Sequence, residues 1–477
     1  MRPLRLSPRT ACRFPLLLAG LAGVCLALAP GRACAVPPFT LETVDGGPGQ
    51  FVGEYSSMKL DHLGHPHVAY YDGLAGHLKY ARHDGASWHV ETADSSVDDV
   101  GQFASIALDA LDQPHIAYYN QAKGRLCCAV KLATGWRREI ADSASFDCGW
   151  YPTIAIDSLQ QPWIASYDRG TGNPRLSRRS SAGTWSGQYA DTSFDLSGFY
   201  ATLALDRKQR PHMAWYNLTR HMLEYATLKN GLWLRETVDS SASNVGLYSS
   251  LKLDPFGRVH VAYMDLTHGT VCHAVRDGTT QRWTHEVVDG GAHFVGYDCS
   301  LTLDPIGCPN ISYHDGTTLS LRFARLQASG WKLEEVDDSP GITGLFSSVA
   351  CDASGAIRIS YWDGTAYTLR FAWAPSEVLL DAGSPPAPVA RGLTLSPNPA
   401  RAGARVRFTS GEAGLAAYEV YDIAGRSQAR VAADATGAAD WDTRGPTGRA
   451  VAPGVYLARA VRRDGSLGET RRLVVVR

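Results

Sequence analysis

Two sets of residues recur along the chain at positions where they could bind a ligand. A Gly-x-aromatic sequence occurs six times, and its aromatic residues are Tyr55, Phe103, Tyr151, Tyr200, Tyr248 and Phe346. A carboxylate or amide residue follows further along each unit, at Asp72, Asn120, Asp168, Asn217, Asp265, Asp315 and Asp363. Aromatic faces stack on the C–H groups of sugars, and carboxylates and amides bond sugar hydroxyls. If both sets share one face, the sequence predicts a carbohydrate-binding surface.

The same residues also have a structural interpretation, because every feature of a repeated unit is itself repeated. The aromatic side chains would then pack between units, and the Asp and Asn side chains would cap turns. We expect this structural role in most copies and a binding role in a subset. The histidines that begin apolar strands are expected to be buried and hydrogen-bonded rather than to act as ligands; they are His67, His115, His212 and His260.

No catalytic residue is assigned from the sequence. A glycosidase needs two carboxyl groups roughly 5 Å or 6.5–9.5 Å apart, and no such pair stands out from the repeats. The first candidates are the irregular acids Asp98, Asp99, Asp147, Asp195 and Asp298; the last of these follows Gly296-Tyr297 in the one unit that departs from the aromatic pattern. Arg322 and Arg370 share one strand position in adjacent units and form either an anion clamp or solvated strand residues.

Several function classes are disfavoured. The sequence contains no P-loop, dinucleotide fingerprint, zinc spacing or nucleophile elbow, so no cofactor and no metal are predicted, and binding is favoured over catalysis. The formal net charge is −1, but residues 391–477 carry 14 Arg against 8 acids and residues 1–35 carry five Arg, which leaves about −12 for residues 36–390. Because an acidic body repels phosphate backbones, nucleic acid is not expected as a partner.

The elements that position these residues form a repeat. An Asp after an apolar run recurs every 48 to 50 residues, at Asp61, Asp109, Asp157, Asp206, Asp254, Asp304 and Asp352. Each unit contains four short strand patterns separated by turn residues, which is typical of a β-propeller blade. The repeated Asp is expected to accept backbone N–H bonds in the following turn. A metal-binding role is the alternative, but no second ligand follows at a fixed spacing.

The two ends of the repeat indicate how the ring closes. Six units end in a strand that opens with Trp, whereas the seventh stops at 369–375 without one. The segment 39–45 matches the missing strand, so we expect it to complete the last blade and remove two sheet edges. The predicted fold is all-β, a seven-bladed propeller closed by an N-terminal strand. An open solenoid is the alternative and would not need the displaced strand.

The N-terminus is typical of a secretory signal peptide at residues 1–35. Four arginines precede an apolar run from Phe14 to about Pro30, and Ala33-Cys34-Ala35 fits the cleavage site. A membrane anchor is the alternative, but the run is short. We therefore expect a secreted or outer-surface protein with no membrane span after cleavage. Export permits disulfides, and seven cysteines follow the cleavage site. Possible pairs are Cys127 or Cys128 with Cys148, and Cys272 with Cys299; the other two cysteines are Cys308 and Cys351.

The chain after the repeats reads as a separate domain. Residues 36–375 form the propeller, the Pro- and Ala-rich residues 376–392 a linker, and residues 393–477 a small β-sandwich with alternating apolar residues. Pro397-Asn398-Pro399, Tyr421-Asp422, Trp441-Asp442 and Pro453-Gly454-Val455-Tyr456 resemble the immunoglobulin-like domain of flagellar hook-capping proteins and of type IX secretion sorting tails. The resemblance implies an export and attachment signal read by secretion machinery. A plain accessory sandwich is the alternative.

These observations predict an exported bacterial binding protein whose propeller face binds an extracellular glycan or a surface protein. A secreted polysaccharide hydrolase or lyase of sialidase type, acting in the same face, is the alternative from another class. A structural adhesin or scaffold without a small ligand is the third. A binding protein would show saturable sugar binding without product, and an enzyme would release product. A scaffold would show neither but would associate tightly with another protein.

Overall fold

The computed structural model describes residues 39–375, except 242 and 328, and residues 393–476, except 399, 411–414, 423–425, 435–436 and 464–466. The predicted signal peptide at 1–35 and the predicted linker at 376–392 lie outside the described residues.

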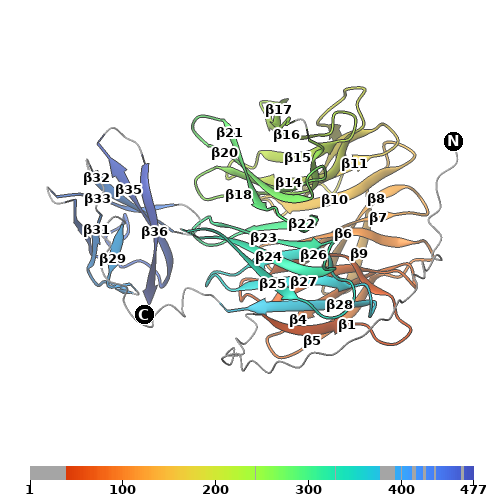
Figure 1. Ribbon diagram of the computed structural model, residues 1–477, viewed down its shortest axis with the longest axis horizontal. Helices are drawn as coiled ribbons and strands as arrows, with labels where there is room; N and C mark the ends of the chain where they lie inside the picture. The colour runs from red at the N-terminus through yellow and green to blue at the C-terminus, as the bar shows by residue number, and fades with distance from the viewer. Residues whose placement is uncertain are drawn as a thin grey trace, which may run out of the picture. The chain divides into compact units, whose positions relative to one another are not determined.

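Residues 39–375 form seven four-stranded antiparallel sheets that follow one another along the chain (Figure 1). The first three blades are β2 (Val52–Leu60), β3 (Pro66–Asp72), β4 (His77–His83) and β5 (Trp88–Asp94); β6 (Val100–Leu108), β7 (Pro114–Asn120), β8 (Arg125–Leu132) and β9 (Gly135–Asp142); and β10 (Cys148–Ile156), β11 (Pro162–Asp168), β12 (Asn173–Arg179) and β13 (Trp185–Tyr189). The next three are β14 (Ser197–Leu205), β15 (Pro211–Asn217), β16 (Met222–Lys229) and β17 (Leu232–Asp239); β18 (Val245–Leu253), β19 (Val259–Asp265), β20 (Thr270–Arg276) and β21 (Trp283–Asp289); and β22 (Val295–Leu303), β23 (Pro309–Asp315), β24 (Ser320–Gln327) and β25 (Gly330–Asp337).

The seventh blade joins the two ends of the ring. Its strands are β26 (Thr343–Cys351), β27 (Ile357–Asp363), β28 (Thr368–Ala374) and β1 (Thr40–Asp45), and β1 pairs antiparallel with β28 so that Thr40 lies opposite Trp373. Figure 1 shows the red β1 beside the cyan β28. The predicted closure by the N-terminal strand is therefore confirmed. It satisfies the free edge of β28, which an open solenoid would leave exposed.

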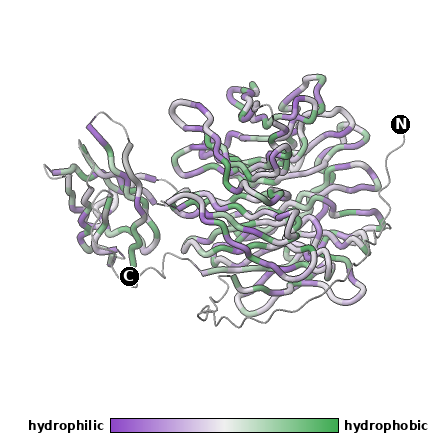
Figure 2. The backbone as a smooth tube through the Cα atoms, in the orientation of Figure 1, coloured by the Kyte–Doolittle hydropathy of each residue, from purple (hydrophilic) through white to green (hydrophobic). Residues whose placement is uncertain are grey.

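The blades pack face to face through apolar side chains. Hydrophobic and hydrophilic residues alternate along the strands (Figure 2), and the core clusters join successive blades, as Leu78 and Tyr80 of the first blade do with Ile106 and Ile116 of the second. A buried tyrosine of strand two also donates to the Asp that ends the preceding blade. The five pairs are Tyr70–Asp45, Tyr118–Asp94, Tyr263–Asp239, Tyr313–Asp289 and Tyr361–Asp337, at 2.5–2.7 Å.

The repeated Asp after each innermost strand caps a turn, as predicted. Its Oδ1 accepts the backbone N–H groups two and four residues further on, so that Asp61 bonds Leu63 and His65 at 2.9 and 2.8 Å. The same pair of bonds forms at Asp109, Asp157, Asp206, Asp254, Asp304 and Asp352. These bonds replace water at backbone groups that the tight turn leaves unpaired.

The second described segment contains two sheets that share one core. One sheet has the order β29-β31-β34 and the other β30-β36-β35-β32-β33. Side chains of both sheets, including Phe408, Trp441, Tyr418 and Leu473, form a single buried cluster. The strands are β29 (Thr394–Ser396), β30 (Ala400–Arg401), β31 (Val406–Thr409), β32 (Leu415–Asp422), β33 (Ser427–Ala432), β34 (Ala439–Trp441), β35 (Gly454–Arg462) and β36 (Leu467–Val476).

The described residues contain no disulfide. All seven cysteines between Cys127 and Cys351 are free thiols, five of them buried, so neither predicted pairing forms in this structure. Among the residues described, no group of His, Cys, Asp or Glu side chains could hold a metal ion, and no helix is long and apolar enough to cross a membrane.

Candidate ligand-binding site in the central channel

The six Gly-x-aromatic sequences lie within the innermost strands of their blades. Gly53 has φ +107°, and a Cβ added there would lie 2.8 Å from the Leu369 backbone of the preceding blade. Glycine is required because only it combines this φ with so close an approach. The strand register shifts on both sides of Glu54, and this bulge places Tyr55 at φ 55°.

The bulge recurs in all seven innermost strands and directs seven side chains into one cavity. The residues at this position have φ between 50° and 56°; they are Tyr55, Phe103, Tyr151, Tyr200, Tyr248, Asp298 and Phe346. All seven line a cavity of about 530 Å³ at the centre of the ring. Neighbouring aromatic rings are in contact, with centroids 4.5–4.7 Å apart from Phe346 through Tyr55 to Tyr248. We call these seven residues and their cavity the aromatic cup.

Asp298 interrupts the ring of aromatic side chains. Its Oδ2 accepts the backbone N–H of Phe346 at 2.8 Å, and its carbonyl accepts the Ser347 hydroxyl at 3.1 Å. Among the described residues no cation pairs with it, and burial raises its pKa to about 6. The carboxylate is the only one lining the cavity and remains partly exposed to it. The cup therefore offers aromatic surface, four tyrosine hydroxyls and one acid of unusually high pKa.

The predicted Asp and Asn set does not line the cup. These side chains cap the turn between strands two and three: Asp168 Oδ1 accepts the N–H groups of Gly170 and Thr171 at 3.0 and 3.3 Å. The other six accept equivalent turn bonds, at Asp72, Asn120, Asn217, Asp265, Asp315 and Asp363. Their turns do lie on the cup's side of the ring, since Gly73 N–H donates to Phe51 O just before β2. Their predicted ligand contacts would therefore involve a ligand extending beyond the cup.

Four of the five irregular acids have side-chain partners, whereas Asp298 accepts only a backbone N–H. Asp147 accepts from Tyr119 Oη at 2.6 Å and Trp150 Nε1 at 2.8 Å, and Arg169 pairs with it. Asp98 and Asp195 pair with Lys123 and Arg220, and Asp99 accepts from Tyr71 Oη. Asp298 alone faces the cavity without a counter-charge. Of the five acids that depart from the repeat pattern, only Asp298 is therefore a candidate site residue. The other four belong to hydrogen-bond and ion-pair networks within the protein.

Glu54 is an acid that the sequence analysis did not single out. It precedes Tyr55 on β2 and forms no ion pair with a described residue, and burial raises its pKa to about 7. The equivalent residues of the other blades are uncharged: Gln102, Trp150, Phe199, Leu247, Tyr297 and Leu345. That difference was a signal available in the sequence. Its meaning depended on burial, which the sequence does not report.

The predicted anion clamp and histidines have internal roles. Arg322 and Arg370 pair with Asp289 and Asp337 at 3.0 and 2.8 Å, so both guanidinium groups are used by the carboxylates that end the preceding blades. The early histidines are buried, as expected. His67 and His212 bond the hydroxyls of Tyr80 and Tyr225, and His260 bonds His273, while His115 lies 3.4 Å from Asp109.

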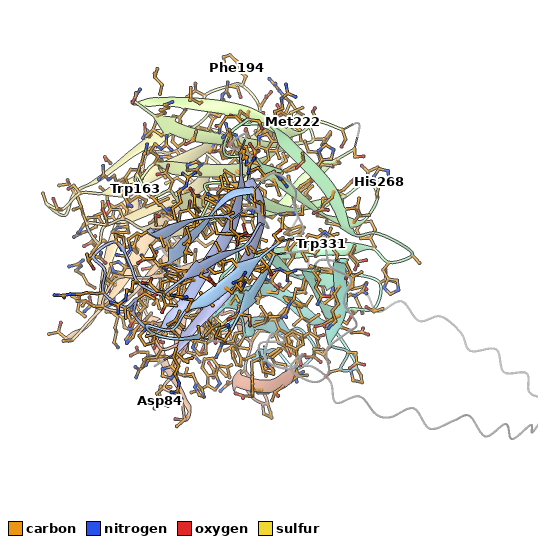
Figure 3. The ribbon with its side chains drawn as sticks, turned by 90° about the vertical axis from the view of Figure 1, so that its left-hand side faces the viewer. Asp84, Trp163, Phe194, Met222, His268 and Trp331 are labelled. Atoms are coloured by element: carbon orange, nitrogen blue, oxygen red, sulfur yellow. The ribbon has the colours of Figure 1, made fainter. Side chains whose placement is uncertain are left out.

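The loops on the cup's side of the ring carry exposed apolar side chains. Val97 and Phe194 are fully exposed, and Phe146 is 80% exposed. All three lie in loops that lead from the outer strand of one blade to the innermost strand of the next. Figure 3 shows Phe194 at the outer margin of the propeller. We call these three exposed side chains the apolar rim.

Comparison with known proteins identifies the fold. No protein-family model matches the sequence, and no curated protein matches it. Streptogramin B lyase is similar in structure, with a TM-score of 0.50 and 10% identity over 70% of this chain and 97% of that chain. The fold is a β-propeller. At this identity the likeness shows the fold alone.

Two further solved structures are similar at lower TM-scores. PorZ, a surface component of the type IX secretion system of Porphyromonas gingivalis, has a TM-score of 0.48 and 14% identity over 91% of this chain and 61% of PorZ. This chain thus spans about 61% of PorZ's length. The polysaccharide lyase Uly1 has a TM-score of 0.42 and 11% identity over 67% of this chain and 89% of that chain.

Proposed function

We propose that this protein is an exported binding protein whose propeller holds a saccharide in the aromatic cup. The supporting observation is the ring of six aromatic side chains, each turned into one cavity by the same backbone bulge. A cavity of about 530 Å³ is within the size range of small-molecule sites. Aromatic faces provide stacking surface for sugar C–H groups, and the tyrosine hydroxyls and Asp298 provide hydrogen bonds to sugar hydroxyls.

The proposal is tested by binding of the purified full chain to a broad glycan array, followed by calorimetry with each retained glycan. Tyr151→Ala and Tyr248→Ala each remove one stacking face and should weaken binding about tenfold. Phe194→Ala, which removes a fully exposed ring outside the cup, should leave affinity unchanged. A blank array, or cup variants that bind like the wild type, would show that the rings serve packing only.

A protein partner is a second candidate, favoured by the apolar rim. Val97, Phe146 and Phe194 expose apolar side chains on three successive loops on the cup's side of the ring, and exposed apolar surface of this kind suits a protein partner. Phe146→Asp and Phe194→Asp should then abolish association with a surface protein while leaving glycan binding intact. If both variants keep every protein association of the wild type, this candidate fails.

Polysaccharide hydrolysis or lysis is the third candidate. Asp298 lines the cup and has a raised pKa, and burial also raises the pKa of Glu54, the residue before Tyr55. Acids of raised pKa are suited to proton transfer near neutral pH. An enzyme would release reducing or unsaturated ends from a bound glycan, and Glu54→Gln or Asp298→Asn would stop the release. Binding without product in the wild type would eliminate this candidate.

We also propose that residues 393–477 form an immunoglobulin-like sorting domain that engages type IX-like secretion machinery. The two sheets with their shared core are compatible with such a sandwich, and the Pro397-Asn398-Pro399 and Tyr421-Asp422 pattern resembles that family. Deleting residues 393–477 should leave the propeller inside the outer membrane of a host that has this machinery. If the truncated chain still reaches the surface, the domain has another role.

A further inference from the structure

Two lysines occupy the same position of the innermost strand in different blades. Lys59 of β2 lies opposite His67, and Lys252 of β18 lies opposite His260. The five other blades have small side chains at this register position, namely Ala107, Ala155, Ala204, Thr302 and Ala350. The lysines are thus the only charged residues at this position of the seven innermost strands. Each lies four residues beyond the cup residue of its own strand, Tyr55 or Tyr248, toward the opposite end of the channel.

Neither lysine has a counter-charge. Within the described parts of the chain, no ion pair and no side-chain hydrogen bond involves Lys59 or Lys252. Burial lowers the pKa of both, and the charge of Lys59 further lowers the pKa of Lys252, to about 7. β2 and β18 belong to the first and fifth blades of the ring, so the effect of Lys59 on the pKa of Lys252 fits two ammonium groups that both extend into the channel between these strands.

The nearest carboxylates are already used. Asp61 accepts the backbone N–H groups of Leu63 and His65, and the Asp254 carboxylate binds the Arg258 guanidinium at 2.5 Å. Neither carboxylate contributes to the pKa of either lysine.

Elsewhere the propeller pairs its interior cations. Lys79 pairs with Asp45, Arg322 with Asp289 and Arg370 with Asp337. All three cations sit on strand three and meet the Asp that ends the preceding blade. Lys59 and Lys252 are only half-buried but have no such partner among the described residues, and two like charges near each other destabilise one another. The contrast indicates that a ligand supplies the missing negative charge at Lys59 and Lys252.

We propose that the channel between Lys59 and Lys252 binds an oxyanion: a phosphate, sulfate or carboxylate group. Two ammonium groups from different sides of the ring can each donate to separate oxygens of one anion, and such charge-assisted bonds are short and strong. The Thr302 hydroxyl lies on the same level of the ring and is a further donor. This site is independent of the aromatic cup and of the ligand proposed for it.

The test measures thermal stability and calorimetric binding of the purified full chain with sodium phosphate and sodium sulfate, at constant ionic strength set with chloride. Wild-type protein should show a saturable rise in melting temperature with each anion. Lys59→Met and Lys252→Met keep a long side chain without charge, and each should weaken phosphate binding about tenfold. Lys208→Met, at an exposed turn of the same propeller, is the matched control and should bind like the wild type.

A second arm identifies the source of the anion. Glucose 6-phosphate that binds more tightly than inorganic phosphate would show that the anionic group belongs to a larger ligand, whereas preference for inorganic phosphate would show a free ion. In the absence of anion, both Met variants should be at least as stable as the wild type, because an unpaired charge has been removed. The inference is overturned if all three anions leave the wild-type melting temperature unchanged, or if the Met variants bind phosphate like the wild type.

Discussion

Replacing Asp298 by Asn should stabilise the protein at neutral pH. Burial raises the pKa of this carboxyl from 3.8 to about 6, so between those values the folded state keeps a proton that the unfolded state has lost. Stability from the neutral carboxyl is therefore fully present below pH 3.8 and is lost as pH rises through 6. The difference between 3.8 and about 6 corresponds to about 3 kcal/mol of unfolding free energy above pH 6.

Asparagine removes the charge and keeps the hydrogen bond. Its side-chain oxygen can still accept the Phe346 N–H that now lies 2.8 Å from Oδ2 of Asp298. In denaturant titrations, Asp298→Asn should exceed the wild type by about 2–3 kcal/mol at pH 8 and by less than about 1 kcal/mol at pH 4. We expect the wild type to keep this destabilising carboxylate because its ionised form binds a ligand.

Asp147→Asn is the matched control with the opposite sign. Its carboxylate accepts from Tyr119 and Trp150 and pairs with Arg169, so the substitution should destabilise the protein by about 1–3 kcal/mol at pH 8. The reasoning about Asp298 is refuted if Asp298→Asn is no more stable than the wild type at pH 8. It is refuted equally if the gain is the same at pH 4, because the cost would then not come from ionisation.

Three further perturbations test the ring itself. Gly53→Ala should lower the free energy of unfolding by about 1–3 kcal/mol in denaturant titrations, because its Cβ would meet the Leu369 backbone at 2.8 Å. Gly47→Ala, with no atom within 4 Å of the added Cβ, should be nearly neutral. Equal effects of the two substitutions would contradict the close-approach argument. Asp45→Asn weakens the contacts of the closing strand with Tyr70 and Lys79. It should lower the melting temperature of the propeller and its free energy of unfolding by about 1–3 kcal/mol. An unchanged transition would show that closure does not depend on this carboxylate. Because the seven thiols of the propeller are free, a reducing agent should leave the melting temperature unchanged, and a fall on reduction would reveal a disulfide.

The repeat, the blade and the closure were predictable because each depends on local sequence. A turn capped by Asp61 needs only residues two and four positions further on, and the alternation that forms a strand is also read along the chain. The closing strand could be found because 39–45 repeats the pattern that the seventh unit lacks. The binding role of the Asp and Asn set, by contrast, was proposed from types and spacing alone and remains a prediction.

What the sequence by itself determined is the number of blades, the order of their strands and the level of the ring at which each repeated residue lies. Only the tertiary structure decided which of these residues meet. The bulge that recurs at Tyr55 and its equivalents turned six aromatic rings and Asp298 into one cavity. Burial raised the pKa of Glu54 and Asp298. Ring closure placed Lys59 and Lys252 at one level of the channel without a counter-charge. Residues about 50 to 290 positions apart share a solvent environment only after the ring closes, and the desolvation that gives them their chemistry arises from that packing.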